Sequence, residues 1–488
     1  MLETQKENEL YQERLKKLKN LEAMGIEGFP TDAHRTHAVE DVLGSFDALT
    51  KKEAEVTIAG RIRALRGHGK LVFGNVEDQT ASMQFAVKSD EVGEQAFGAF
   101  QNFDIGDFVE ITGTCFLTKK GERTVLAKKF RLLAKSLRAL PEKFHGLKDA
   151  ELRLRKRYLD LIANPEVRQM FVKKSLFWQT IRSHMNQSGF TEVETPILEA
   201  VPGGAEAEPF ITHHNALNRD FYLRISLELP LKRLLVGGYE KVFEIGRIFR
   251  NEGVSTEHLQ DYTQMEFYWA YADYNDLMIF LQGLYRDVIK ALFGKLKVAS
   301  RGYEADWGKE WKRYDFYELF SANAGLDLRS VTEAELKARA KQLGITYEKF
   351  AKKGRLIDLI YKKTVRPKLI EPGFLLNPPI ELEPLAKRLP DDHNRVQRLQ
   401  VIAYGTELGK GFSELNDPID QRSRFEEQMK LRAAGDSEAQ QLDEDFVEAL
   451  EYGMPPAAGF GLSERLFAVL MDKPIRETVI FPPMKEEK

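Results

Sequence analysis

The stretch RISLELPLKRLLVGGYEKVFEIGRIFRNEGVSTEHLQDYTQMEFY, residues 224–268, decides how the rest of the sequence is interpreted. Apolar and small residues lead into its central tripeptide RNE, residues 250–252, and polar and apolar residues alternate at 266–269. Such alternation favours a strand. The polar loop 253–261 is too long for a tight hairpin turn and is typical of loops that carry function. The sequence therefore predicts two strands joined by a functional loop.

Charged side chains gather at one end of this predicted hairpin. Arg250 and Glu252 follow the first strand, Glu266 and Tyr268 lie on the returning strand, and His258 lies in the loop. An arginine fork can hold a carboxylate and a phosphate together, as a reaction that joins an acid to ATP requires. The alternative is an exposed hairpin with a surface ion pair.

Length and composition indicate a globular protein of two or three domains. The 488 residues are 43% hydrophobic and 30% charged, which is ordinary for such a protein. The net charge of −3 gives no global sign of nucleic-acid binding, so a local basic face would have to provide it. The single cysteine, Cys115, excludes an intrachain disulfide and a cysteine-based zinc site. Because the sequence has neither an apolar run of about 18 residues nor an apolar signal segment, we expect a cytoplasmic protein without a membrane span.

The segment FRNEG, followed by a histidine and YTQMEFYWAY, resembles motif 2 of class II aminoacyl-tRNA synthetases, in the form found in lysyl-tRNA synthetases. The resemblance extends from about Glu9 to Lys485, and the class I signature sequences are absent. It implies an α+β fold, with an N-terminal OB-fold β-barrel and a class II catalytic domain in which helices flank an antiparallel sheet of about six or seven strands. It also implies that the protein activates L-lysine with ATP, with Mg²⁺ as cofactor, and transfers the lysyl group to tRNA(Lys).

Patterns along the chain predict how it divides into domains. Residues 5–23 have the pattern of a charged helix, with an apolar stripe (Leu10, Leu15, Leu18 and Leu21) and a basic exposed side (Arg14, Lys16, Lys17 and Lys19). This pattern is as compatible with a solvated helix as with RNA contact. Residues 56–137 contain five short alternating segments, which suit an OB barrel. The predicted division is a helical extension at 1–55, an anticodon-binding OB-fold domain at 56–140, a linker at 141–163 and a catalytic domain at 164–488, with a helical insertion at about 314–375.

Two residues of the predicted barrel match positions with which the family reads the anticodon. The resemblance implies that Phe73 stacks on a base and that Gln84 forms a hydrogen bond with one. From the sequence alone, Phe73 is equally compatible with the barrel core. Lys129 stands where some family members have a glutamate that touches the anticodon, so that contact is not implied.

The segment that follows the linker resembles motif 1, the dimer interface of class II synthetases. Asn164-Pro165 predicts a helix start, with a capping side chain and proline in the first turn. The alternation in GFTEVETPIL, residues 189–198, then predicts a strand that reaches Pro196. The resemblance implies a homodimer that forms through this segment.

A second catalytic stretch is QVIAYGTELGKGFSELND, residues 400–417. In a strand, Lys410, Phe412 and Glu414 share one face, and Glu407 falls on the other face unless a β-bulge re-aims it. The resemblance implies that Glu407 binds Mg²⁺ together with ATP. It also implies that Glu414 receives the ammonium group of the substrate side chain.

The segment GMPPAAGFGLSERL, residues 453–466, resembles motif 3 and completes the implied ATP site. By this resemblance, Tyr262 and Arg465 sandwich the adenine, and Glu252 contacts its amino group. His258 meets the β- or γ-phosphate. Arg250 bridges the lysine carboxylate and the α-phosphate and is the implied catalytic residue.

The implied lysine site combines Gly204 with residues of the stretches 224–268 and 400–417. Its members are Gly204, Glu228, Arg250, Glu266, Tyr268, Phe412 and Glu414. The backbone of Gly204 and the carboxylates of Glu228 and Glu266 would hold the α-ammonium. Tyr268 and Glu414 would pair with the ε-ammonium, while the Phe412 ring packs along the side-chain stem.

The sequence also departs from the family pattern. Gln400 stands where a second Mg²⁺-binding glutamate is usual, Lys410 where asparagine is usual, and Glu383 where serine is usual. Motif 3 is one residue shorter than usual, with Glu464 in place of aspartate. Two alternatives follow: a relative that charges aspartate or asparagine, for which Lys410 would supply the cation, and a synthetase-like RNA-binding protein with impaired catalysis.

Overall fold

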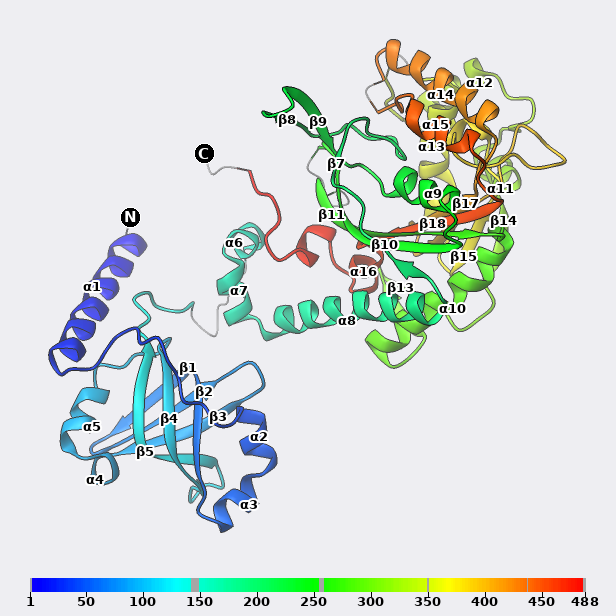
Figure 1. Ribbon diagram of the computed structural model, residues 1–488. Helices are drawn as coiled ribbons and strands as arrows, with labels where there is room; N and C mark the ends of the chain where they lie inside the picture. Colours follow the sequence, from blue (N-terminus) through cyan, green and yellow to red (C-terminus); the bar gives the residue numbers. More distant parts are fainter. Residues whose placement is uncertain (1, 142–148, 254–258, 349–350, 437, 486–488) are drawn as a thin grey trace. The chain divides into compact units, whose positions relative to one another are not determined.

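The computed structural model describes residues 2–141, 149–253, 259–348, 351–436 and 438–485 (Figure 1). The chain divides into two compact units, Met1–Asp149 and Ala150–Lys488. Within the described ranges, no helix combines the length and the apolar character that crossing a membrane requires.

The first unit is a closed five-stranded barrel with short helices around it. Its elements are α1 (Leu2–Ala23), α2 (Val39–Gly44), α3 (Phe46–Lys51), β1 (Glu55–His68), β2 (Leu71–Glu77), β3 (Ser82–Lys88), α4 (Ser89–Val92), α5 (Glu94–Phe100), β4 (Phe108–Leu117) and β5 (Arg123–Ala134). The strand order β1-β2-β3-β5-β4 closes the barrel, which confirms the predicted OB fold. Alternate residues of β1 and β4, such as Val56, Ile58, Val109 and Ile111, are fully buried, as a filled small barrel requires.

The N-terminal helix α1 belongs to this unit. Leu18 and Leu21 are buried, as the apolar stripe in the sequence predicts. Arg14 does not lie on the exposed basic side where it was expected. Its guanidinium donates to the carbonyl oxygens of Ser136, at 2.9 Å, and Arg138, at 3.0 Å, and so attaches the helix to the segment after the barrel.

The second unit is built on an eight-stranded sheet. Its strands, in sheet order, are β14 (Lys312–Asp315), β15 (Gly373–Leu376), β16 (Arg398–Ala403), β17 (Thr406–Ser413), β18 (Ala457–Ser463), β11 (Asp261–Ala270), β10 (Lys241–Phe249) and β6 (Thr191–Glu192). The six central strands are antiparallel. Each edge strand pairs in parallel with its neighbour, which brings the sheet to eight strands instead of the six or seven expected.

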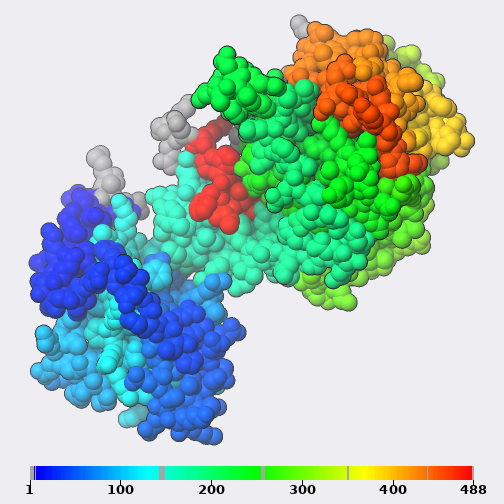
Figure 2. Space-filling view, viewed as in Figure 1, coloured from blue at the N-terminus to red at the C-terminus, as the bar shows by residue number. Residues whose placement is uncertain are grey.

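Helices and two small sheets surround this main sheet. The helices are α6 (Ala150–Arg155), α7 (Arg157–Ala163), α8 (Pro165–Gln187), α9 (Glu228–Val236), α10 (Tyr274–Phe293), α11 (Phe316–Ala324), α12 (Glu333–Gln342), α13 (Lys353–Thr364), α14 (Pro418–Ala433), α15 (Glu444–Glu451) and α16 (Arg465–Leu470), with 3-10 turns η1 (Arg366–Lys368), η2 (Ile380–Leu382) and η3 (Ile475–Thr478). The small sheets are β7 (Leu198–Glu199), β8 (Ile211–His214) and β9 (Arg219–Leu223), and β12 (Lys297–Ser300) with β13 (Tyr303–Asp306). Figure 2 shows α14 and α15 in orange on the outside of this unit.

The segment that resembles motif 1 differs from its prediction in two details. Helix α8 begins at Pro165 as predicted, but Asn164 does not cap it. Its side-chain amide donates instead to the Asp160 carboxylate in α7, at 2.6 Å. Within the predicted strand at 189–198, only Thr191 and Glu192 of β6 and Leu198, the first residue of β7, lie in strands.

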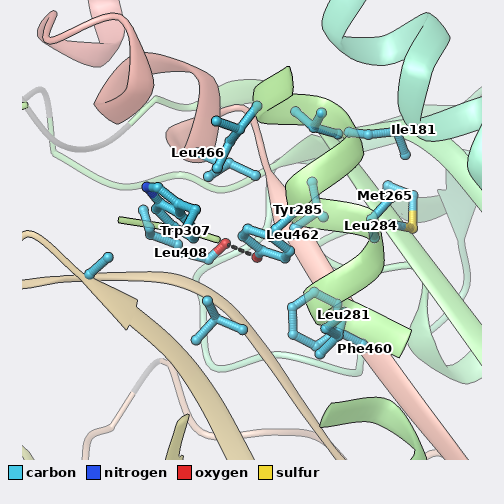
Figure 3. Packing of buried hydrophobic residues seen from close by; sticks show 14 of the residues in the cluster. Ile181, Met265, Leu281, Leu284, Tyr285, Trp307, Leu408, Phe460, Leu462 and Leu466 are labelled. Atoms are coloured by element: carbon cyan, nitrogen blue, oxygen red, sulfur yellow. Dashed lines mark hydrogen bonds between the residues drawn. The ribbon is translucent and has the colours of Figure 1, made fainter. Parts of the chain in front are cut away.

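Strict alternation along the central strands separates a core face from a pocket face. Met265, Phe267 and Phe460 are buried on the face that packs against α8 and α10. Figure 3 shows this core, where the Tyr285 hydroxyl of α10 donates to the Leu408 carbonyl at 2.8 Å. The residues between them in sequence, such as Glu266, therefore point to the opposite face, where the site lies.

Candidate active site

A pocket of about 440 Å³ lies on the face of the sheet opposite the α8–α10 core. Ten of the predicted site residues line this pocket: Gly204, Glu228, Arg250, Glu252, Tyr262, Glu266, Tyr268, Glu407, Phe412 and Arg465. Glu414 and Gln400 lie just outside this lining, and His258 lies outside the described residues. The fold therefore brings Gly204 together with residues of the stretches 224–268, 400–417 and 453–466, as the sequence predicts.

Arg250 follows the last residue of β10 and is fixed at the mouth of the hairpin. Its backbone N–H donates to the Gln260 carbonyl at 2.9 Å, which joins the two arms of the loop. Its Nε donates to the Ile225 carbonyl at 3.2 Å, and its guanidinium carbon lies 5.7 Å from the centre of the Tyr262 ring. The guanidinium is thus held against the pocket by groups on either side of it.

Glu266 is buried at the centre of the pocket floor. One carboxylate oxygen accepts from the Ser226 hydroxyl at 2.9 Å and the Leu227 N–H at 3.2 Å, and the other accepts from the Tyr268 hydroxyl at 3.2 Å. Burial raises the pKa of Glu266, and these donors partly offset that effect. Gly461 stands beside it on β18, where a Cβ would lie 3.3 Å from Glu266 Cγ, so the floor above this carboxylate stays open.

The most buried charges of the site include a residue that the sequence analysis missed, Lys232. Its side chain is fully buried in α9, and its Nζ lies 2.6 Å from Glu228 Oε1 and in contact with Glu414 Oε2. Glu414 is therefore paired with a lysine of the protein, and Tyr268 donates to Glu266 instead of Glu414. A lysine four residues after a glutamate, within the apolar helix ELPLKRLLV, was the signal in the sequence.

Glu414 keeps one oxygen without a partner. Within the described parts of the chain, neither oxygen accepts a hydrogen bond of regular geometry, but Oε2 contacts the Lys232 ammonium, whereas Oε1 is buried with no donor or cation beside it. A Cβ at Gly459 would collide with this oxygen and with the Tyr268 ring, so the missing side chain of Gly459 allows the two to approach each other. Gly459 and Tyr268 both line the pocket, which places the Glu414 carboxylate directly behind its wall.

Glu407 reaches the pocket because β17 carries the bulge that the sequence analysis considered. The register passes from Ile402–Glu407 to Val401–Gly409 and leaves Leu408 as the extra residue. The hydrogen bond from Tyr285 to Leu408 fixes the bulge from the core side (Figure 3). Gln400 then donates its amide to Glu407 Oε2 at 2.5 Å.

Lys410 and Glu383 form an ion pair on the pocket wall. Lys410 Nζ lies 2.9 Å from Glu383 Oε2, and Arg398 Nε lies 3.3 Å from the same oxygen. Burial lowers the pKa of Lys410, but Glu383 outweighs that effect and the pKa is raised. The two unusual residues are therefore partners, and Lys410 does not pair with Glu414 in this structure.

Comparison with known proteins identifies the family. Residues 149–485 match the model of tRNA synthetases class II (D, K and N), and residues 56–133 match the OB-fold nucleic acid binding domain. The chain belongs to the class II tRNA synthetases.

Curated relatives within this family match over their full length. A protein of Carboxydothermus hydrogenoformans and one of Moorella thermoacetica are each 46% identical, with 99% of this chain and 99% of the relative covered. A protein of Halalkalibacterium halodurans is 44% identical over 98% of this chain and 97% of the relative. Each of the three is named Lysine--tRNA ligase.

The pocket of this class II synthetase has two ends. We call Glu228, Lys232, Glu266 and Glu414 the inner end, and Glu252, Tyr262, Glu407 and Arg465 the outer end. At the outer end the Arg465 Nε is buried and has no hydrogen-bond partner in the described residues. Burial raises the pKa of Tyr262, so its hydroxyl stays protonated beside Arg250. Among the described residues, the Arg465 Nε–H and the Tyr262 hydroxyl are therefore free to contact a ligand.

The outer end offers little to a metal ion by itself. Within the described ranges, no group of three or more His, Cys, Asp or Glu side chains is arranged to hold a metal. Glu407 is a suitable carboxylate for a phosphate-bound Mg²⁺, which keeps most of its coordination for phosphates and water. Gln400 supplies an amide where a second carboxylate was considered, and this amide already donates to Glu407.

In the OB-fold unit of this synthetase, Phe73 and Gln84 lie on the outer face of the barrel. Both are half-buried and absent from the barrel core, which contains Val72 and Val76 instead. Gln84 Oε1 accepts from the Thr124 hydroxyl at 2.8 Å, so this contact does not use its amide N–H groups. Phe73 is therefore not a core residue, and its ring can stack on a base.

Proposed function

We propose that the protein is a lysine–tRNA ligase that activates L-lysine with ATP and transfers the lysyl group to the 3′ end of tRNA(Lys). The observation that carries this proposal is the buried Glu414 Oε1, an acceptor without a donor behind the aromatic wall of the pocket. A buried carboxylate oxygen in this state calls for a cation, and an ammonium group on a four-carbon stem is suited to reach it. Tyr268 and Phe412 provide apolar and π surfaces for that stem.

The charges of the inner end favour lysine over the acidic alternatives. Glu228, Glu266 and Glu414 carry three negative charges when ionised, against the single positive charge of Lys232. The two ammonium groups of lysine would balance this difference, with Glu228, Glu266 and the backbone of Gly204 holding the α-ammonium. Aspartate would instead place its side-chain carboxylate against Glu414, which is why we set aside an aspartate- or asparagine-charging enzyme.

The chemistry follows from where Arg250 lies. A lysine carboxylate oxygen attacks the α-phosphorus of ATP, its bond to pyrophosphate breaks, and lysyl-adenylate forms. Arg250 would neutralise the charge that gathers on the carboxylate and the α-phosphate in the transition state. A terminal ribose hydroxyl of tRNA then attacks the lysyl carbonyl, and AMP leaves. No protein nucleophile is needed, because the pocket acts by position and charge.

The outer end would bind the nucleotide. Tyr262 and Arg465 would enclose the adenine ring, Glu252 would accept from its amino group, and His258 would reach the terminal phosphates. Mg²⁺ bound with ATP would neutralise phosphate charge, and Glu407 is the residue that would hold it.

The assembly and location we propose rest on other features. Val172 and Leu176 of α8, with Ile197 and Leu198 after it, are exposed apolar residues in the motif 1 segment, which suits a homodimer. Phe73 and Gln84 would read the anticodon of tRNA(Lys). A reduced, cytoplasmic setting suits the free thiol of Cys115.

Amino-acid-dependent ATP–pyrophosphate exchange tests the proposal. We expect exchange with lysine and none above background with aspartate or asparagine. Exchange with aspartate alone would refute lysine activation. An enzyme that binds tRNA(Lys) but catalyses no exchange with any amino acid would support the binding-protein alternative.

A further inference from the structure

The ammonium group of Lys232 is enclosed by the residues that the substrate side chain would meet. Its Nζ lies 5.9 Å from the centre of the Tyr268 ring and 5.3 Å from that of Phe412, in addition to its ion pairs with Glu228 and Glu414. The two carboxylates come from different elements, α9 and the segment after β17. The ion pairs of Lys232 therefore connect α9 to the segment after β17.

Packing does not explain a lysine at this position. Its neighbours on α9, Leu231 and Leu235, are buried leucines, and Lys232 itself is fully buried. Removing an ammonium from water carries a desolvation penalty of several kcal/mol, which only well-placed carboxylates offset. The apolar alternative, a leucine or methionine, would leave Glu228 and Glu414 as two buried carboxylates without a cation between them.

The ion pair also sets the direction of the Glu414 carboxylate. Oε2 contacts Lys232, and Oε1 lies against Gly459 and Tyr268, which line the pocket. The Glu414 backbone is held separately, because its N–H donates to the Ala457 carbonyl at 2.8 Å. Loss of Lys232 would therefore release the side chain while the strand stays in place.

We infer that Lys232 is a positioning residue for amino-acid specificity, which favours the charged form of Glu414 and turns its Oε1 toward the ammonium group of the substrate side chain. This inference rests on the proposed lysine–tRNA ligase function. It assigns Lys232 no contact with the reacting atoms.

The charged groups around Glu414 determine how a variant would respond to pH. Lys232 and Glu228 face it from α9, Glu266 and Tyr268 from β11, and Glu383 acts on it from the segment after η2. Burial raises the pKa of Glu414 well above its ordinary value, and Lys232 lowers it. Without Lys232 the pKa of Glu414 would rise further, so at any given pH less of this carboxyl group would be ionised, and its charge would return as the pH increases.

The experiment is the pH dependence of the lysine KM in the Lys232→Met enzyme, measured by ATP–pyrophosphate exchange from roughly pH 6 to 9. At neutral pH we expect the KM for lysine to rise about 10- to 100-fold, the effect of losing a charge-assisted contact. We expect this defect to shrink as the pH increases, since Glu414 regains its charge. The KM for ATP and the kcat at saturating lysine should change little.

Two further variants separate positioning from folding. Lys232→Gln retains amide donors for both carboxylates but lacks the charge, so it should fold and show the same pH-dependent defect. Lys135 is the matched control, because it is also fully buried and lies 2.6 Å from Asp104 and 2.8 Å from Asp107 in the barrel unit. Lys135→Met should lower the thermal midpoint and leave the pH profile of the lysine KM unchanged.

The outcomes are distinguishable from failure of the proposed function. A lysine KM defect of equal size at every pH, or a parallel loss of ATP affinity, would overturn the positioning role. So would misfolding of both Lys232 variants, because it would make the residue structural. If the unmodified enzyme shows no lysine-dependent exchange, the proposed function fails before Lys232 is tested.

Discussion

The inner and outer ends of the pocket differ in how their charged side chains are paired, although each has a buried polar atom without a partner in the described residues, Glu414 Oε1 and Arg465 Nε. At the inner end, Glu266 accepts several hydrogen bonds, and Lys232 joins Glu228 to Glu414 in the buried floor. At the outer end, Arg465 has a buried Nε without a partner in the described residues. Glu252 after β10, Tyr262 on β11 and Glu407 on β17 complete that end.

This difference suits two ligands of different kinds. A small amino acid must be told apart from close analogues, and buried charges in fixed positions discriminate strongly because an unmatched partner leaves them unpaired. A nucleotide is large and must be exchanged in each cycle, so side chains that complete their contacts only on binding are sufficient. We therefore expect inner-end variants to affect lysine and outer-end variants to affect ATP.

Arg250 lies between the two ends, and its loss should have the largest effect. We expect Arg250→Ala to lower kcat on the order of 10³-fold, because the guanidinium stabilises charge that develops in the transition state. ATP–pyrophosphate exchange at saturating lysine and ATP measures this. Arg247→Ala is the control: Arg247 lies on β10, shortly before Arg250, and its guanidinium donates to Asp261 at 2.7 Å in a partly exposed pair, so activity should stay near normal. Equal losses in the two variants would contradict the role of Arg250.

Glu414→Gln should raise the KM for lysine roughly 100-fold and leave the KM for ATP unchanged, since a neutral amide replaces the buried anion that meets the side-chain ammonium. Steady-state exchange at varied lysine and varied ATP separates the two constants. A defect divided equally between lysine and ATP would mean that the two ends do not act separately.

The sequence could predict much of this arrangement because it depends on local rules. Alternation along a strand places Lys410, Phe412 and Glu414 on one face, and nearby glycines permit the bulge that turns Glu407. The sequence could not predict the ion pairs that join distant segments. The partner of Glu414 is Lys232 and the partner of Lys410 is Glu383, and both pairs arise only when the sheet forms.

Local competition explains the details that were wrong. Asn164 has the right type and place for a helix cap, but its side-chain amide donates to the carboxylate of Asp160 and it makes no capping hydrogen bond to α8. Arg14 belongs by pattern to an exposed basic side, yet backbone carbonyls of the segment after the barrel take its guanidinium. In both cases an acceptor from another element outweighs the intrinsic preference.

At the outer end, Arg465→Ala should raise the KM for ATP about 10-fold, because a guanidinium stacked on a ring contributes on the order of 1 kcal/mol. The KM for lysine should stay the same. Binding of a non-hydrolysable ATP analogue, measured by calorimetry, provides a check that does not depend on turnover. A change confined to lysine would reverse the assignment of the two ends.

The smallest effect concerns Glu199, a carboxylate of β7 that lies outside the pocket. Its Oε2 is buried without a hydrogen-bond partner in the described residues, and burial raises its pKa to about 8. Between its ordinary value of 4.5 and about 8, the folded protein keeps a proton that the unfolded chain has released, so the free energy of unfolding falls as the pH rises through that window.

Glu199→Gln removes this cost. We expect the variant to be more stable than the unmodified protein at alkaline pH by on the order of 1 kcal/mol, with no difference at acidic pH and an unchanged KM for lysine. Urea unfolding at the two pH values measures it, and equal urea midpoints for the two proteins at both would refute it. Glu414→Gln also removes a buried carboxylate, but it breaks the buried ion pair with Lys232 and should therefore lose both stability and lysine binding. The contrast would show that the Glu414 carboxylate serves an ion pair and a ligand, whereas the Glu199 carboxylate only lowers stability.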